Sequence, residues 1–128
     1  MGIISLILIL ANVIVSYRGF KDSAFYDKYK FRVDAILLYK DYKRAITSGF
    51  LHVSWMHLIF NMIALYFFSG SLELYLGPLR FLLIYFASLV GGDLLSLFIH
   101  RNDGDYDSVG ASAGVSGVIF ASIALIPG

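Results

Sequence analysis

Four apolar runs constrain the fold of this chain more than any other feature. They cover residues 2–17, 54–68, 81–99 and 112–126 of a 128-residue sequence. A helix needs about 20 mostly apolar residues to cross the hydrocarbon core of a bilayer, where only helices and closed barrels satisfy their own backbone hydrogen bonds. The runs therefore predict an all-α fold, a polytopic membrane helix bundle with about four transmembrane helices, in one domain of residues 1–128.

The composition agrees with this fold class and narrows the partners. Hydrophobic residues make up 59% of the chain and charged residues 15%, whereas an ordinary soluble domain has about 25% charged residues. A net charge of +1 gives no argument for a nucleic acid partner. We therefore expect the lipid bilayer as a partner. The chain has no cysteine, which excludes disulfides, thiol nucleophiles and Cys-ligated metals.

The first run predicts a retained span, because it lacks the basic segment before it and the Ala-x-Ala pattern after it that a cleaved signal peptide needs. Residues 18–48 follow, with eight of the ten basic residues and four acidic ones. This mixture of charged and aromatic side chains suits a segment in the membrane interface. The positive-inside rule would place the segment in the cytoplasm.

Glycine and proline residues at 69–80 predict a connector between the second and third runs. The third run then contains three small or polar residues, Gly91, Gly92 and Asp93. Such residues fit a helix–helix interface better than a lipid-facing surface.

The stretch LHVSWMHLIFN, residues 51–61, places polar side chains in an apolar run. Ionisable residues are rare in membrane spans and by default indicate a functional site. His57 and Asn61 are spaced i, i+4 and share one helix face, from which they could stabilise an oxyanion, while His52 lies at or before the helix start. The alternative is that His57 and Asn61 only hydrogen-bond neighbouring helices together. His52 and His57 fit no zinc signature, so we expect no metal.

A second polar stretch, VGASAGVSG at residues 109–117, opens the last run with Ser112 and Ser116. A serine at a helix N-terminus lies beside free N–H groups and the positive end of the helix dipole, which favour an oxyanion. The alternative is close helix packing through Gly110, Gly114 and Gly117.

In this order, the motifs resemble those of the rhomboid family of intramembrane serine proteases. HVSWMHLIFN has the family's HxxxxHxxxN spacing, and RAITSGFLH at residues 44–52 resembles its WR-L-x-T-x-x-F-x-H segment. GSLE at 70–73, LG at 76–77 and RF at 80–81 resemble the connector between its second and third helices. VGASAGVSGVIFA resembles its serine loop and fourth helix. The resemblance extends from about Asp41 to the last residue.

The resemblance implies a bundle of six core helices, of which this chain would hold the first four. The family's nucleophile, the serine of a GxSx motif, matches Ser112. Ser116 is the second choice, since the family often has the nucleophile first and another serine one turn later. By the same resemblance, His57 and Asn61 would support the oxyanion and His52 the cavity, without a cofactor. The family's cytoplasmic amino end would put residues 18–48 on the outer side, against the charge rule.

The sequence departs from the family pattern at two points. Ala113 follows Ser112 where the family usually has glycine. The family's base is a histidine on the sixth helix, and this sequence reaches only four helices. His100 matches no position of that base. We therefore expect the domain to be incomplete at its C-terminal end and the 128 residues alone to be inactive.

Three hypotheses follow. The first is a rhomboid-type serine endopeptidase, a multi-pass protein of a bacterial inner membrane that cleaves transmembrane segments of membrane proteins. The second is a catalytically inactive rhomboid-like protein that binds membrane helices without cutting them. The third is a helical scaffold without a site, which would leave Ser112, His57 and Asn61 facing lipid or separate interfaces.

Overall fold

Three helices long and apolar enough to cross a membrane form most of the molecule. The computed structural model describes residues 2–125, and these helices are α1 (Ile3–Lys21), α5 (Trp55–Leu76) and α6 (Pro78–Ile99). A fourth apolar helix, α7 (Ser112–Leu125), has 14 described residues, or about 21 Å of helix. The predicted end of this run at residue 126 lies outside the described residues. The all-α membrane bundle is thus confirmed, with three full-length spans and a shorter fourth helix.

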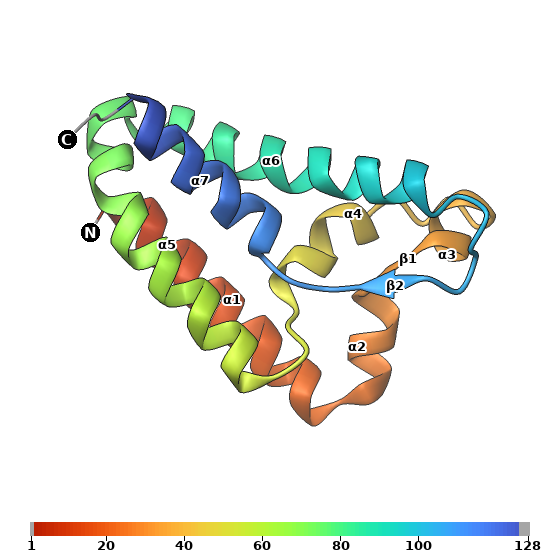
Figure 1. The fold of residues 1–128 in the computed structure, drawn as a ribbon. Coiled ribbons are helices and arrows are strands. Elements are labelled where there is room, and N and C mark those ends of the chain that lie inside the picture. The colour runs from red at the N-terminus through yellow and green to blue at the C-terminus, as the bar shows by residue number, and fades with distance from the viewer. Residues whose placement is uncertain (1, 126–128) are drawn as a thin grey trace.

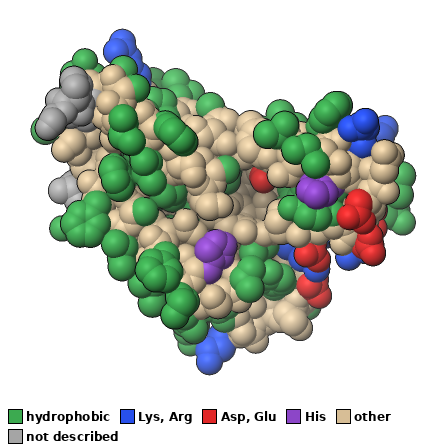
Figure 2. Space-filling view, viewed as in Figure 1, with side chains coloured by type: hydrophobic (Ala, Val, Ile, Leu, Met, Phe, Trp, Pro, Cys, Tyr) green, Lys and Arg blue, Asp and Glu red, His purple; other side chains and the backbone are tan. Residues whose placement is uncertain are grey.

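The helix α7 packs against both α5 and α6, and α1 packs along α5 (Figure 1). The side chains of the shared core come from all four helices: Leu8, Leu58, Met62, Leu65, Leu72, Phe81, Tyr85, Val115 and Val118. Many large apolar side chains on α1, α5 and α6 instead face outward (Figure 2). This distribution is expected of helices whose outer surface contacts lipid.

Glycines bring α7 close to α6. A Cβ on Gly117 would collide with Ser88, and a Cβ on Gly114 would lie 3.0 Å from the ring of Tyr85. Gly92 of α6 is equally close to α7, because a Cβ there would lie 2.8 Å from that of Ala113. The packing interpretation of the glycine pattern is therefore right for Gly114 and Gly117.

The predicted connector over residues 69–80 is wrong. The second helix does not end at residue 68 but continues to Leu76, and the third begins at Pro78, so Gly77 alone joins them. Gly77 has φ +86°, which favours glycine, and proline suits the first helical position because its missing N–H would have no partner there. The helix continues past Gly70 because Leu72 and Glu73 are buried, and this packing outweighs the roughly 1 kcal/mol propensity cost of a helical glycine.

The helix α1 turns a polar face toward the bundle and runs to Lys21 rather than to residue 17. Ser5, Asn12 and Ser16 are fully buried, and their spacings of seven and four residues put them on one face. The Ser5 hydroxyl and two backbone N–H groups at the start of α1 donate to the Glu73 carboxylate at 2.6–3.0 Å. Asn12 Nδ2 lies 3.4 Å from the Tyr85 hydroxyl. These contacts join α1 to α5 and α6.

The segment between α1 and α5 lies at one end of the bundle (Figure 1). It contains α2 (Ser23–Tyr29), β1 (Phe31–Arg32), α3 (Val33–Leu37), α4 (Arg44–Thr47) and the 3-10 helix η1 (Ser48–Phe50). The strand β1 pairs antiparallel with β2 (Asp107–Ser108), and Lys30 forms an ion pair with Asp107 at 2.9 Å. Because β2 precedes α7, this pairing holds η1 and the following loop beside the start of α7.

Candidate active site

The chain enters α7 through a turn that requires glycine. Gly110 has φ +130°, and its N–H donates to the Ser48 carbonyl at 3.0 Å. A Cβ at this position would also lie 2.8 Å from Cε1 of His57. Glycine therefore allows both the turn and the close approach of α5, two residues before Ser112.

A chain of hydrogen bonds runs from this turn to α1 through His52. The Ala111 N–H donates to His52 Nε2 at 3.3 Å, and His52 Nδ1 lies 2.9 Å from Ser16 Oγ. The Ser16 hydroxyl donates to the Phe50 carbonyl at 2.8 Å. We call these four residues the His52 network. Since Nε2 accepts a hydrogen bond and the Ser16 proton is directed at Phe50, the proton of the neutral ring belongs on Nδ1.

The surroundings of His52 favour its neutral form. The side chain is 1% exposed. Burial, and secondarily the neighbouring His57, lowers the pKa of His52 from 6.5 to about 4. Protonation of Nε2 would break the bond to Ala111, so the neutral ring is the one that fits. Both ring nitrogens are occupied, which suits the supporting role predicted for His52.

The start of α5 carries the other two polar residues of the motif. Ser54 caps the helix by accepting the His57 N–H at 3.3 Å, and the rings of His57 and His52 lie 5.0 Å apart. Asn61 follows His57 by one turn, and its Nδ2 is buried without a hydrogen-bond partner among residues 2–125. A buried donor left unpaired costs about 1–3 kcal/mol. This amide is therefore a group that a ligand oxygen could satisfy.

A cavity of about 350 Å³ opens beside Ser112. Figure 2 shows a hollow between α6, α7 and β2 with an acidic group in it. We call it the serine cavity, and it is lined by Ser48, Gly92, Asp93, Ser96, Tyr106, Ser108, Val109, Gly110, Ser112, Ala113 and Ser116. Both candidate serines are exposed. Ser112 is the first residue of α7, where backbone N–H groups are free, whereas Ser116 lies one turn inside the helix.

Asp93 is the acidic residue of the serine cavity, although its place beside Gly91 and Gly92 predicted only a helix interface. Its Oδ2 accepts from the Ser48 hydroxyl at 3.4 Å. Among residues 2–125, no basic side chain lines the cavity. An acidic residue in an apolar run is itself a signal of function, and that signal could have marked Asp93. Gly91, predicted at the same interface, has open space around it.

The structure brings some predicted site residues together. His52 and His57 contact the backbone immediately before Ser112, and Ser112 and Ser116 line the same cavity. His57 and Asn61 do not line that cavity. Both histidines therefore cluster at the turn before Ser112, whereas His57 and Asn61 face a different space from Ser112.

The third histidine lies at the edge of this region. His100 stacks on Tyr106 with ring centroids 3.6 Å apart, and Tyr106 rather than His100 lines the serine cavity. This stack holds the imidazole against another ring, and His100 does not line the cavity that Ser112 and Ser116 share.

Known proteins are similar to this chain over most of its length. Residues 39–128 match the family model described as the Rhomboid domain. RHOMBOID-like protein 12, mitochondrial, of Arabidopsis thaliana is 27% identical over 98% of this chain and 41% of its own length. Rhomboid-like protease 3 of Toxoplasma gondii is 37% identical over 59% of this chain and 28% of its own length. Inactive RHOMBOID-like protein 8 of Arabidopsis thaliana is 35% identical over 63% of this chain and 23% of its own length. The chain thus spans less than half the length of these relatives.

Proposed function

Since this chain belongs to the rhomboid family, we propose that it forms part of an intramembrane serine endopeptidase that cleaves transmembrane segments of other membrane proteins. The observation that carries the proposal is the position of Ser112. It begins α7 and lines a polar cavity within a bundle of apolar helices. The similarity to a relative named as a protease supports the same activity.

In the proposed reaction, Ser112 Oγ attacks the carbonyl carbon of the scissile peptide, and its proton passes to a general base. His57, Asn61 and the backbone N–H of Ser112 stabilise the oxyanion. The leaving amine takes the proton from the base, and water then hydrolyses the acyl-enzyme. The unpaired Nδ2 of Asn61 and the contact of His57 with Gly110 support this assignment of donors, and because neither side chain lines the serine cavity, the oxyanion would lie on the α5 side of Ser112.

We take the general base from a part of the whole protein outside these 128 residues. Both nitrogens of His52 are occupied, His57 is assigned to the oxyanion, and His100 stacks on Tyr106. A histidine that faces the serine cavity from a further helix would reach Ser112. The proposal therefore includes no turnover by the 128 residues alone.

The alternative function is recognition of membrane helices without cleavage. The 35% identity to a relative named as inactive favours it. The same bundle would then bind a helix while Ser112 stays unreacted.

The proposal also includes the membrane that holds the protein and the orientation of the protein in it. We place the protein in a bacterial inner membrane with its amino end in the cytoplasm, so that the serine cavity faces the outer side. Added trypsin would then cut residues 18–48 in spheroplasts without lysis. Cleavage only after lysis would reverse the orientation.

Cleavage in reconstituted vesicles tests the function. The whole protein that contains these residues is mixed with single-span substrates, and products are identified by mass spectrometry. We expect Ser112→Ala to reduce cleavage by about 10⁴-fold or more and Ser116→Ala to leave most of it. Loss in Ser116→Ala alone would move the nucleophile to Ser116. Binding of the substrates without cleavage, by a folded protein, would establish the alternative.

A further inference from the structure

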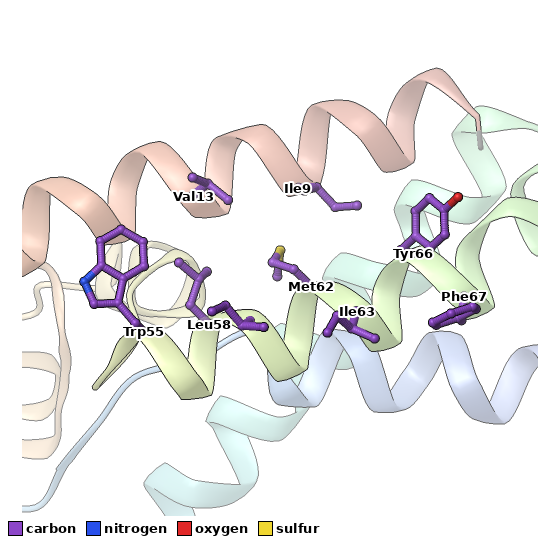
Figure 3. A pocket seen from close by; sticks show the side chains of 9 residues that line it. Ile9, Val13, Trp55, Leu58, Met62, Ile63, Tyr66 and Phe67 are labelled. Atoms are coloured by element: carbon purple, nitrogen blue, oxygen red, sulfur yellow. The ribbon is translucent and has the colours of Figure 1, made fainter.

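An apolar groove of about 410 Å³ separates α1 from α5 on the outer surface of the bundle. In Figure 3, Ile9 and Val13 point from α1 toward α5, and Trp55, Met62 and Tyr66 point from α5 toward α1. The groove lies on two helices that are each long and apolar enough to cross a membrane. In a bilayer these helices would be surrounded by hydrocarbon, so the groove would open onto acyl chains.

The length of the groove matches one leaflet. Along α5 it extends from Trp55 to Phe67, a separation of about 18 Å at the α-helical rise. Half of a hydrocarbon core is about 15 Å thick. Tryptophan is enriched where hydrocarbon meets headgroups, so the Trp55 end is the interfacial end. The groove thus has the length and orientation of a single acyl chain.

A lysine lies at the interfacial end. Tyr17 follows Val13 by four residues on α1, and its ring lies 6.2 Å from that of Trp55. Lys21 follows Tyr17 by four more, and its Nζ lies 5.7 Å from the centre of the Tyr17 ring. Among residues 2–125, no carboxylate lies within 4.0 Å of Lys21. A lysine at headgroup level attracts anionic lipid.

The other cation of the same helical turn points elsewhere. The guanidinium of Arg18 lies 4.5 Å from the centre of the Phe25 ring on α2, and Phe25 does not line the groove. Lys21 is therefore the charge connected to the groove, through Tyr17 and Trp55.

We propose that this groove binds one anionic phospholipid, with an acyl chain between α1 and α5 and the phosphate at Lys21. The site is separate from the serine cavity. It binds lipid whether or not the protein cleaves substrates.

Native mass spectrometry tests the proposal on the whole protein that contains these residues, released from vesicles of equal parts phosphatidylglycerol and phosphatidylcholine. We expect one phosphatidylglycerol to remain bound in preference to phosphatidylcholine. Lys21→Gln should reduce that preference about fivefold, since one lysine near the surface is worth about that factor. Arg18→Gln is the matched control and should keep it. Equal retention of the two lipids by the unaltered chain, or equal effects of the two variants, would overturn the proposal.

A second pair of variants tests the acyl-chain part. Val13→Trp fills the groove and should reduce retention of both lipids, whereas Ile14→Trp places the same indole at a position outside the groove. If both variants retain lipid like the unaltered chain, no chain occupies the groove. A dimer that Val13→Trp abolishes would instead assign the groove to a second copy, and that result would also overturn the proposal.

Discussion

The His52 network and the serine cavity meet at the turn before Ser112. They differ in how far their polar groups are buried and hydrogen-bonded. In the network, both nitrogens of a buried ring and the Ser16 hydroxyl have partners at 2.8–3.3 Å. In the cavity, Ser112 and Ser116 are exposed, and Asp93 has one partner at 3.4 Å. Satisfied buried networks rigidify a structure. The comparison indicates that the network fixes the backbone and leaves the cavity free for chemistry.

Removing the imidazole should have the largest effect on stability. His52→Ala leaves the Ala111 N–H without an acceptor, removes the donor to Ser16 Oγ and creates a cavity. We expect the free energy of unfolding to fall by about 4 kcal/mol, measured by denaturant titration in mild detergent.

The matched control is His100→Ala in the loop after α6, which should cost less than about 1 kcal/mol. Equal losses for the two variants would show that the network does not stabilise the fold.

Adding a methyl group at the turn should have the next largest effect on stability. Gly110→Ala must adopt φ +130° and bring Cβ within 2.8 Å of His57, which should cost about 2–3 kcal/mol. Gly91→Ala is the control, since Gly91 has open space around it in a helix and alanine there should stabilise by up to about 1 kcal/mol. Similar thermal midpoints for both variants would contradict the turn's role.

Lowering the pH should reduce the contribution of the His52 network to stability by a smaller amount. The pKa of His52 is lowered from 6.5 to about 4 in the folded state, so the unfolded chain binds more protons between these values. Its contribution to stability is complete above pH 6.5 and is lost as the pH falls toward 4.

Between pH 6.5 and 5 this loss should be about 2 kcal/mol. The free energy of unfolding, measured across this range, should depend less steeply on pH in His52→Gln, which has no imidazole to titrate. The same slope in both proteins would exclude His52 as its cause.

The smallest effect on stability is expected in the cavity. Asp93→Asn keeps an oxygen that can accept from Ser48, so stability should change by less than about 0.5 kcal/mol. The reaction rate of Ser112 with a fluorophosphonate should change instead, because an amide replaces the acidic group that lines the same cavity. A stability loss above about 2 kcal/mol with an unchanged rate would make Asp93 structural.

The apolar runs were sufficient to predict the helices, but not the inner face of α1. Ser5, Asn12 and Ser16 look like interruptions in the sequence, and they prove to be the buried face of the helix. Their spacing was visible, but periodicity alone does not tell whether polar residues of a membrane helix face protein or water. Their partners Glu73, Tyr85 and His52 lie 36 to 73 residues away, and only the folded chain reveals them.

For the same reason, only part of the candidate site could be predicted from the sequence. His52, His57 and Ser112 could be selected from their chemistry and from resemblance. The separation of Asn61 from the serine cavity, and the position of Asp93 in it, depend on how α5 and α6 rotate about α7. No local pattern encodes that rotation.

Locating a covalent adduct shows whether Ser112 is the nucleophile. The whole protein is reacted with a fluorophosphonate in vesicles, digested, and the modified serine is identified by tandem mass spectrometry. We expect an adduct on Ser112 that Ser116→Ala retains. An adduct on Ser116, or none on a folded protein, would contradict it.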